Sequence, residues 1–475
     1  MRTLTMKFGG SSIGTTAALT QVASIVLQAH ERWDRMMIVV SALDGVTDAL
    51  IEAAHLARLA NRRGYRRIVA TIRTRHLALV DKLPLNTEAR NALQTIIDRI
   101  LFEMLDTCQT LSDHAASDDQ PDTTDAIIGV GERIAARITA ALLRHSGLRA
   151  VTLDTTELII TDSARRTSHL NVAETRARIE EHLLPMLERE IIPVITGFIA
   201  STPAGKTTTL GRGGSDFTAS IVSVMAGADE LWMWTAFDGI MTTDPREVTG
   251  AQVIPELSYD EAAEMAYFGA RILHTRMIEP LREHKIPVYV KNVFKPQLLG
   301  TCIHYIADPQ PPRIKAVTAI AGIALTANRS GSATDVISAV HETLIDPGTI
   351  GTPIDVMITG QTASQTTLCF VIPTSAGPGA LEVAQAAIQR RLSDDDQLDD
   401  WRVFPVTVIT AIGSLQRQQP RLLARVFAAL DDTPIVALSQ SPARSSLSIA
   451  VQPADAPQAL QRIHALTIEP VTSDQ

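Results

Sequence analysis

The feature that most constrains the fold is an alternation of short apolar segments with segments of helical spacing over roughly the first 300 residues. Residues 3–8 and 36–42 are predicted strands, and residues 16–30 between them are a predicted helix. Further buried strands are predicted at 149–154, 191–198, 230–235 and 287–294. Strands separated by helices favour crossover connections, and so an α/β fold with a mainly parallel central sheet covered on both faces.

Two regions depart from this alternation. Residues 65–113 have a helical pattern with almost no strand signal and are predicted to be a helical insertion, ended by a polar loop at 118–125. A proline-rich stretch at 307–313 is predicted to be a linker. Beyond this linker, the order strand, helix, strand, strand, helix occurs twice with an offset of about 80 residues.

The two copies have clear candidate elements. The first has strands at 353–359 and 367–373 and helices at 336–345 and 380–392; the second has strands at 434–439 and 446–453 and helices at 420–430 and 456–466. Two such copies predict a pair of small α+β modules. Modules of this kind usually bind small ligands or each other, so the chemistry is expected in the first part of the chain.

Composition narrows the range of partners and locations. The formal net charge of −9 makes a nucleic-acid partner unexpected. No apolar run reaches the about 18 residues of a membrane span, and the N-terminus lacks the layout of a signal peptide. Cys108, Cys302 and Cys369 form neither a CxxC pair nor a metal-ligand spacing. We therefore expect buried free thiols and a cytoplasmic location.

Two glycine-containing segments are suited to binding anions. KFGGSS at residues 7–12 follows the first predicted strand, so its glycines allow backbone N–H groups to approach an anion and Lys7 adds a positive charge. It is not a Walker loop, and alone it is more typical of a plain tight turn. TTTLGRGGSD at residues 207–216 places three glycines around Arg212, which suits bidentate binding of a carboxylate or phosphate. The alternative there is a flexible glycine loop.

Other segments carry little information when each is taken singly. Glu132, in GVGER, opens a helical run and by itself fits ordinary complementation of the helix dipole. WTAFDG at residues 234–239 follows a buried strand and turns at Asp-Gly. In FGARILH, Arg271 fits a surface cation and His274 a packed core histidine.

Taken together and in order, these segments resemble the aspartate kinase family, which has the amino-acid kinase fold. The resemblance rests on KFGGSS, VVSALDGVTD, GVGER, TTTLGRGGSD, WTAFDGIMTTDPR, SYDEAAEMAYFGARILH and PVYVKNVF…GTCI. It implies a three-layer catalytic domain over residues 1–306, and paired ferredoxin-like ACT regulatory domains over 314–475. The family commonly interleaves the ACT strands, giving one domain at about 321–395 and another made of 314–320 and 401–475.

The resemblance also implies a reaction and its residues. MgATP would phosphorylate the β-carboxylate of L-aspartate, the first step toward lysine, threonine and methionine, with Mg²⁺ carried by ATP and no metal site in the protein. The implied ATP-binding residues are Lys7, Phe8, Gly9, Gly10, Thr235, Ala236, Met241, Arg246, Arg271 and Ile272. The implied substrate-binding residues are Ser41, Thr47, Glu132, Arg212, Gly213, Gly214 and Ser215. Lys7, Arg271 and Asp216 are implied to be catalytic, Arg212 to bind the α-carboxylate and Glu132 to bind the ammonium group.

Three positions depart from the family pattern. Ala236 stands where the family usually has aspartate, Arg271 where it has lysine, and Thr275 where it prefers proline. Arginine keeps the charge of lysine but changes reach and geometry. We interpret these departures as tuning of nucleotide affinity and not as loss of activity.

The regulatory modules leave the effector open. Asp355 follows a strand start where lysine-sensitive relatives place an acidic residue, so it could meet an effector amino group, although an exposed strand-edge aspartate fits equally well. The turn at 328–334 has one glycine where the family tends to have flanking glycines. Lysine, threonine or no effector all fit. The resemblance also implies a homodimer or larger homo-oligomer.

Two other functions stay open. The chain could phosphorylate glutamate or N-acetylglutamate, but an N-acylated substrate has no ammonium group for Glu132, and one extra methylene discriminates by only about 10–200-fold. It could also be an amino-acid sensor with a weakened kinase site, as Ala236 suggests. The presence of Lys7, Arg212, Glu132 and Asp216 speaks against the sensor.

Overall fold

The structure is a computed structural model that divides into two compact units. It describes residues 1–114, 123–162, 169–269, 273–306, 313–327, 333–345, 356–361, 365–372, 376, 379–394, 398, 400–414, 419–441 and 445–468. The first unit comprises Met1–Ile240 and Arg276–Tyr305, and the second Met241–Thr275 and Ile306–Gln475. Most of the predicted linker at 307–313 and of the polar loop at 118–125 lies outside the described residues. None of the described helices is long and apolar enough to cross a membrane.

A mainly parallel sheet is the centre of the first unit. Its strands lie in the order β3-β4-β2-β1-β7-β9-β10. Their bounds are β1 (Thr3–Phe8), β2 (Arg35–Val40), β3 (Ala150–Leu153), β4 (Ile192–Thr196), β7 (Glu230–Thr235), β9 (Val288–Asn292) and β10 (Thr301–His304). The neighbours from β3 to β9 pair in parallel, and β10 pairs antiparallel with β9. The prediction of an α/β fold with a mainly parallel sheet is confirmed.

The two faces of strand β1 have different neighbours. Leu4, Met6 and Phe8 belong to a buried cluster that also contains apolar residues of α2 (Thr16–His30) and α7 (Val130–His145). Helix α10 (Gly214–Met225) also contacts β1, together with β2 and β7. Because successive side chains of a strand point to opposite faces, Lys7 points away from the Met6 and Phe8 face.

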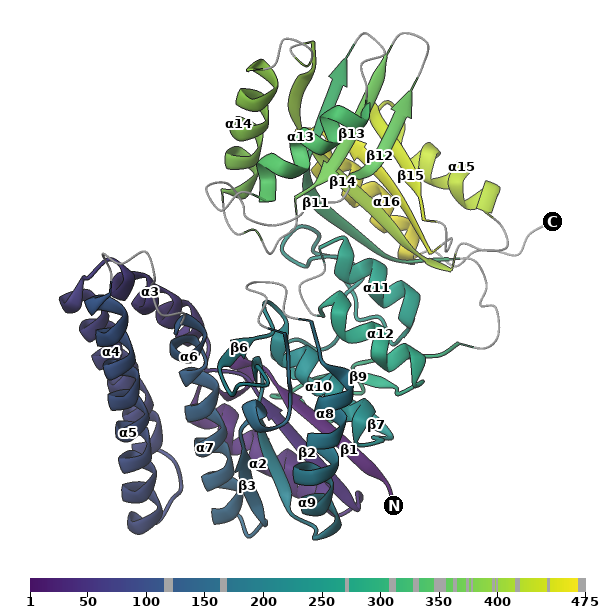
Figure 1. The fold of residues 1–475 in the computed structure, drawn as a ribbon. Coiled ribbons are helices and arrows are strands. Elements are labelled where there is room, and N and C mark those ends of the chain that lie inside the picture. Colours follow the sequence, from purple (N-terminus) through teal and green to yellow (C-terminus); the bar gives the residue numbers. More distant parts are fainter. Residues whose placement is uncertain are drawn as a thin grey trace. The chain divides into compact units, whose positions relative to one another are not determined.

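The residues predicted to form a helical insertion lie in two long helices. These are α4 (Arg62–Asp81) and α5 (Thr87–Asp113), which lie side by side next to α3 (Val46–Arg58) in Figure 1. Apolar residues of α4 and α5, such as Tyr65 and Ile97, extend the buried cluster of the sheet.

The shorter elements are α1 (Gly10–Ile13), α6 (Thr124–Ile128), η1 (Thr155–Glu157), α8 (Val172–Arg178), η2 (Ile179–Leu183), α9 (Leu184–Glu188), β5 (Ile199–Ser201), β6 (Thr207–Thr209), β8 (Glu256–Ser258), α11 (Tyr259–Tyr267) and α12 (Thr275–Glu283).

The second unit contains the two predicted repeats in one antiparallel sheet. The strand order is β12-β13-β11-β14-β16-β15. The bounds are β11 (Arg313–Ala327), α13 (Ala333–Ile345), β12 (Val356–Gln361), β13 (Thr366–Val371) and α14 (Ala380–Ser393) for the first repeat, and β14 (Arg402–Ser414), α15 (Gln419–Leu430), β15 (Ile435–Gln440), β16 (Ser446–Val451) and α16 (Ala456–Ile468) for the second. The long strands β11 and β14 pair antiparallel and join the repeats.

Strand β11 contributes to the cores of both repeats. Ile314 and Val317, in its first half, pack in a cluster with apolar residues of α15 and α16. Ile323 and Leu325, in its second half, pack in a cluster with residues of α13 and α14. The division between the two modules therefore runs through the middle of a strand.

The segment Met241–Thr275 is anchored to the second repeat. The Val317 N–H donates to the Thr242 carbonyl at 2.7 Å, and His464 on α16 lies 2.8 Å from the Thr242 hydroxyl. Helix α11 is attached by an ion pair at 2.6 Å between Lys315 of β11 and Glu261. This segment therefore packs with the C-terminal repeats.

Candidate active site

The predicted phosphate-binding residue Lys7 is ion-paired with Asp216. Lys7 lies near the carboxyl end of β1, and Asp216 lies in the first turn of α10. Both side chains are mostly buried, at 13% and 14% exposure. The Lys7 Nζ also lies 3.6 Å from the point where a Cβ on Gly9 would stand. The lysine charge is therefore held beside the glycine backbone that follows β1.

The loops after β1 and β2 pack against each other without space for a side chain. A Cβ on Gly10 would lie 2.7 Å from the Ala42 carbonyl oxygen and 3.0 Å from the Asp44 nitrogen. The Ser41 N–H donates to the Phe8 carbonyl at 3.1 Å. The loop with Ser41 and the helix turn with Thr47 thus follow a strand neighbouring β1, at the edge where ligands of parallel sheets usually bind.

Glu132 is a buried carboxylate with one free oxygen. It lies in the first turn of α7, is only 2% exposed, and its Oε1 accepts from the Ala42 N–H at 3.1 Å. Its Oε2 has no hydrogen-bond partner among the described residues. Burial raises the pKa of Glu132 to about 7, although the Ala42 N–H and the Arg133 charge oppose that increase. A buried oxygen without a partner is costly, so it marks a place for a cation or donor to bind.

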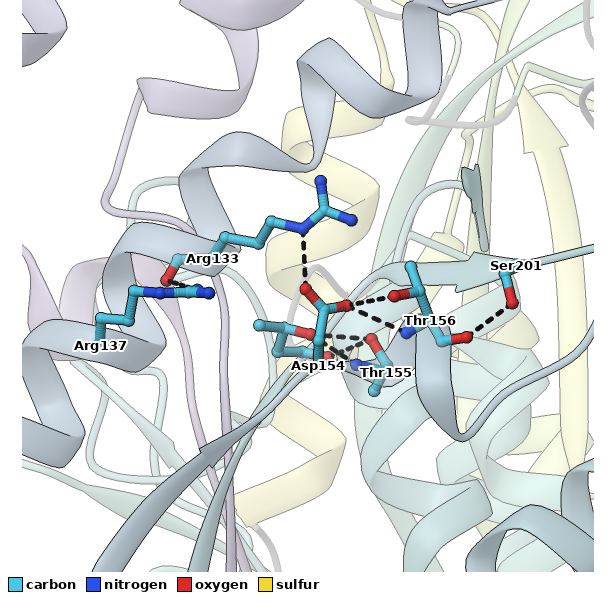
Figure 2. A network of polar contacts seen from close by, with 7 residues as sticks. Arg133, Arg137, Asp154, Thr155, Thr156 and Ser201 are labelled. Atoms are coloured by element: carbon cyan, nitrogen blue, oxygen red, sulfur yellow. Dashed lines mark hydrogen bonds and ion pairs between the residues drawn. The ribbon is translucent and has the colours of Figure 1, made fainter. Parts of the chain in front are cut away.

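A polar network anchors the helix turn that carries Glu132. The Arg133 Nε donates to the Asp154 Oδ2 at 2.8 Å, and Thr156 donates to the Asp154 Oδ1 with its N–H at 3.1 Å and its hydroxyl at 2.8 Å (Figure 2). The Ser201 hydroxyl then donates to the Thr156 carbonyl at 2.6 Å. Burial opposes ionisation of Asp154, but Arg133 and these hydrogen bonds lower its pKa. The network fixes the start of α7 from the side of β3.

The second predicted anion loop connects β6 to α10. Gly211 and Gly213 have φ of +75° and +70°, which side-chain-bearing residues rarely adopt. Arg212 between them is exposed and makes no hydrogen bond or ion pair in the described part of the chain. Gly214 and Ser215 begin α10 and are buried. The loop therefore presents a guanidinium to solvent close to Asp216 in the sequence.

The end of β7 lies against the glycine loop of β1. The Trp234 carbonyl accepts from the Gly9 N–H at 3.4 Å and from the Ser12 hydroxyl at 2.9 Å. The Thr235 hydroxyl accepts from the Phe237 N–H at 2.8 Å, and the Ala236 carbonyl accepts from Asn292 at 3.2 Å. The main chain at Ala236 is therefore positioned without an aspartate side chain.

The remaining predicted site residues lie in the second unit or outside the described residues. Met241 and Arg246 belong to the second unit, where Arg246 is ion-paired with Asp244 at 2.5 Å. Arg271, Ile272 and the effector candidate Asp355 lie outside the described residues. Within the described ranges, no group of three or more His, Cys, Asp or Glu side chains could hold a metal ion.

Three residues that position this site, through backbone groups or an ion pair, do not stand out in the sequence. Asp154 anchors Arg133, and the Asp125 carboxylate accepts from the Thr209 N–H at 3.1 Å. Arg276 donates to the Leu210 carbonyl at 2.8 Å. None of these residues belongs to a recognisable motif, because a contact with a backbone group leaves no pattern in the sequence.

The chain belongs to the amino acid kinase family, whose family pattern it matches over residues 2–292. That range contains Lys7, Glu132, Arg212 and Asp216, the residues around which the candidate site is built. The part of the resemblance that concerns the amino-acid kinase fold is thereby confirmed.

Individual relatives show which proteins of the family the chain is similar to. The chain is 29% identical to the bifunctional aspartokinase/homoserine dehydrogenase 1 of Arabidopsis thaliana over 97% of this chain and 50% of that protein, so it spans about half the length of such relatives. It is 27% identical to Arabidopsis aspartokinase 2, covering 98% of this chain and 84% of that protein. E. coli aspartokinase III, solved with aspartate and ADP, shares 26% identity and a TM-score of 0.78 over 98% of this chain and all (100%) of that one; it has also been solved with lysine and aspartate.

Proposed function

We propose that this chain is an aspartate kinase, which transfers the γ-phosphoryl group of MgATP to the β-carboxylate of L-aspartate. The observation that carries the proposal is the free, buried oxygen of Glu132 beside the loop that follows β2. The ammonium group of an amino acid supplies a positive charge and hydrogen-bond donors for that oxygen. An N-acylated substrate would leave it unpaired, which argues against N-acetylglutamate.

The residues of this chain divide the work between positioning and charge neutralisation. Arg212 binds the α-carboxylate and Glu132 binds the ammonium group, so the β-carboxylate is directed toward the nucleotide. The β-carboxylate oxygen forms a bond to the γ-phosphorus while the bond to the β,γ-bridging oxygen breaks and ADP leaves. The substrate carboxylate is already ionised, so no protein base is needed, and Lys7 neutralises charge on the transferred group.

Mg²⁺ and the nucleotide fit the residues present. The backbone of Gly9 and Gly10 and the charge of Lys7 would hold the phosphates, and Mg²⁺ would supply further charge neutralisation there when bound. Asp216 keeps Lys7 beside Gly9. Thr235 and Ala236 would lie beside the nucleotide, with Met241, Arg246, Arg271 and Ile272 assigned to it from the family resemblance.

We further propose that the C-terminal repeats regulate the kinase by binding an amino acid. Support comes from the two joined α+β repeats and from the lysine present in one structure of E. coli aspartokinase III. Lysine is therefore the first effector to test, with threonine alongside. A homo-oligomer stays a prediction from the family resemblance.

Trapping of the acyl phosphate tests the proposed reaction. Purified protein with MgATP and hydroxylamine should form the hydroxamate of L-aspartate in preference to those of glutamate and N-acetylglutamate. Arg212→Ala should reduce kcat/KM for aspartate at least about tenfold, because a charged hydrogen-bond pair is lost. Lys206→Ala, which removes another exposed cation from the same part of the chain, is the control. Selective glutamate hydroxamate would instead support a glutamate kinase, and binding without turnover would support the sensor.

A further inference from the structure

Arg276 touches both ends of the loop that carries Arg212. Its Nη1 donates to the carbonyl of Leu210, the residue before the loop, at 2.8 Å. Its guanidinium also lies over the ring of Phe217, 4.7 Å from the centroid, and Phe217 is in the first turns of α10 after the loop. One side chain thus bridges the entry and the exit of residues 211–216.

Within the loop the Gly214 N–H donates to the Gly211 carbonyl at 2.9 Å, and few other restraints act on its middle. A Cβ on Gly211 would meet nothing within 4 Å, and both Gly211 and Gly213 adopt positive φ. The restraints are concentrated at the ends, where Leu210 is buried, its N–H donates to the Phe198 carbonyl at 2.8 Å, and Gly214 would clash with Phe198 if it had a side chain. Arg276 fixes the Leu210 carbonyl, so both backbone groups of Leu210 are bound immediately before the glycines begin.

We propose that Arg276 is a positioning residue that closes the Gly211–Gly214 loop and thereby sets the affinity for the substrate carboxylate. We call the two contacts of Arg276, with Leu210 and with Phe217, the clamp. The assignment to aspartate rests on the proposed function, whereas the clamp does not. A charged donor to a carbonyl and a cation over an aromatic face are each stronger than neutral contacts. Holding the loop in one conformation reduces the entropy that substrate binding must otherwise overcome.

The proposal separates two kinetic constants. Arg212 would bind the substrate, while Arg276 contacts the residues at the two ends of the loop, so its loss should raise KM for aspartate and leave the transfer step largely intact. KM for ATP should change less, because Arg276 contacts Leu210 and Phe217, whereas Lys7 of the glycine loop is held by Asp216 within α10. A purely structural role would instead lower thermal stability or disturb both substrates together.

Three variants and one control test this clamp. Arg276→Met keeps the length of the side chain but removes the donor and the charge, Arg276→Lys keeps the charge, and Phe217→Leu removes the ring face. Arg282→Gln is the control, because Arg282 lies on the same helix in a surface pair with Glu279 at 2.6 Å. Hydrogen exchange of peptides covering residues 210–217 reports loop closure without any need for activity.

For Arg276→Met we expect exchange of these amides to accelerate about tenfold and KM for aspartate to rise about tenfold, with kcat within about twofold. Arg276→Lys should recover part of both effects, Phe217→Leu should show a smaller increase in exchange, and Arg282→Gln should show neither. Faster exchange without any aspartate kinase activity would support the clamp and refute the proposed reaction. Unchanged exchange in Arg276→Met, or an equal rise in both KM values, would overturn the clamp.

Discussion

Glu132 and Glu261 are both buried glutamates at the third position of a helix, yet their surroundings differ completely. Glu132 follows Val130 and Gly131 at the start of α7, and Glu261 follows Tyr259 and Asp260 at the start of α11. Their exposures are 2% and 4%. Two carboxylates in the same helical position, one in each unit, therefore differ in their partners.

Glu261 is fully compensated. Its Oε2 accepts from the Ser258 N–H at 2.8 Å in a capping box, and the same oxygen is ion-paired with the buried Lys315 at 2.6 Å. Glu132 has no such cap, because its N-cap residue is Gly129, and the Glu132 side chain turns instead to the loop at Ala42. A structural carboxylate has every partner in place, whereas a ligand-binding one keeps an oxygen free.

The largest expected effect concerns the compensated glutamate. Lys315→Met should destabilise the second unit by about 3–5 kcal/mol, because it leaves the Glu261 carboxylate buried without a counter-charge. Hydrogen exchange of the β11 and β14 amides, measured against denaturant, gives the unfolding free energy of that unit.

A surface pair provides the control for Lys315→Met. Lys295→Met removes an ion pair of similar length, 2.8 Å to Asp238, whose side chains are 53% and 35% exposed. Such exposed pairs contribute about 0–1 kcal/mol, so this variant should be nearly neutral. Equal stability of the two lysine variants would show that Glu261 does not depend on its partner.

Glu132, which is paired with no counter-charge in the part of the chain that the structure describes, should destabilise the folded protein when its carboxylate is ionised. Glu132 has a pKa of about 7 in the folded protein against an ordinary 4.5, so the folded state binds its proton more tightly than the unfolded chain does. The unfolding free energy of the protein without ligand should therefore fall as pH rises from about 4.5 to about 7, by about 3 kcal/mol, and stay at the lower value above pH 7.

Glu132→Gln isolates this pH dependence. The variant should gain about 3 kcal/mol relative to the parent protein between pH 4.5 and pH 8, because glutamine never ionises. Denaturant melts at several pH values measure the difference, in which the contributions of other groups cancel. Glu261→Gln is the matched variant and should lose stability at neutral pH. A Glu132→Gln curve parallel to that of the parent would contradict the burial argument.

Substrate binding should favour the ionised form of Glu132, whereas folding without ligand favours the protonated form. Because an ammonium group binds the ionised carboxylate, aspartate affinity should increase as pH rises toward 7, by up to about tenfold per pH unit. Above pH 7 the affinity should level off. Binding at pH 6 should release a proton, which calorimetry in two buffers of different ionisation enthalpy detects. Glu132→Gln should bind weakly at every pH and release none. Proton uptake by the parent protein would rule out the assigned role of Glu132.

Regular elements were largely predictable from the sequence, because their signal is carried by many residues at once. The predicted strands at 3–8 and 230–235 and the helix at 16–30 match β1, β7 and α2. The approximately 80-residue repeat likewise predicted two copies of the order strand, helix, strand, strand, helix, and the second unit contains both copies.

Single contacts of the site were less predictable. Taken alone, Glu132 fitted ordinary complementation of the helix dipole, and only the family resemblance assigned it a substrate. Its bond to the Ala42 N–H, and that of Arg276 to the Leu210 carbonyl, join residues distant in sequence through the backbone, which has the same groups at nearly every position. The glycine at position 129 is the one sequence feature indicating that Glu132 does not close a capping box, because a serine at that position would have predicted one.

The smallest expected effect concerns the residues that precede the two helices, Ser258 before α11 and Gly129 before α7. Ser258→Ala removes the hydroxyl that accepts from the Glu261 N–H at 3.1 Å, so it should cost about 1 kcal/mol in the unfolding free energy of the second unit. Gly129→Ser is not the simple converse, because a Cβ there would lie 2.5 Å from the Ile199 Cγ2. A serine at 129 should therefore destabilise the first unit even though it supplies a cap. If Gly129→Ser were instead stabilising and left aspartate affinity intact, the glycine would not be what directs Glu132 toward the substrate loop.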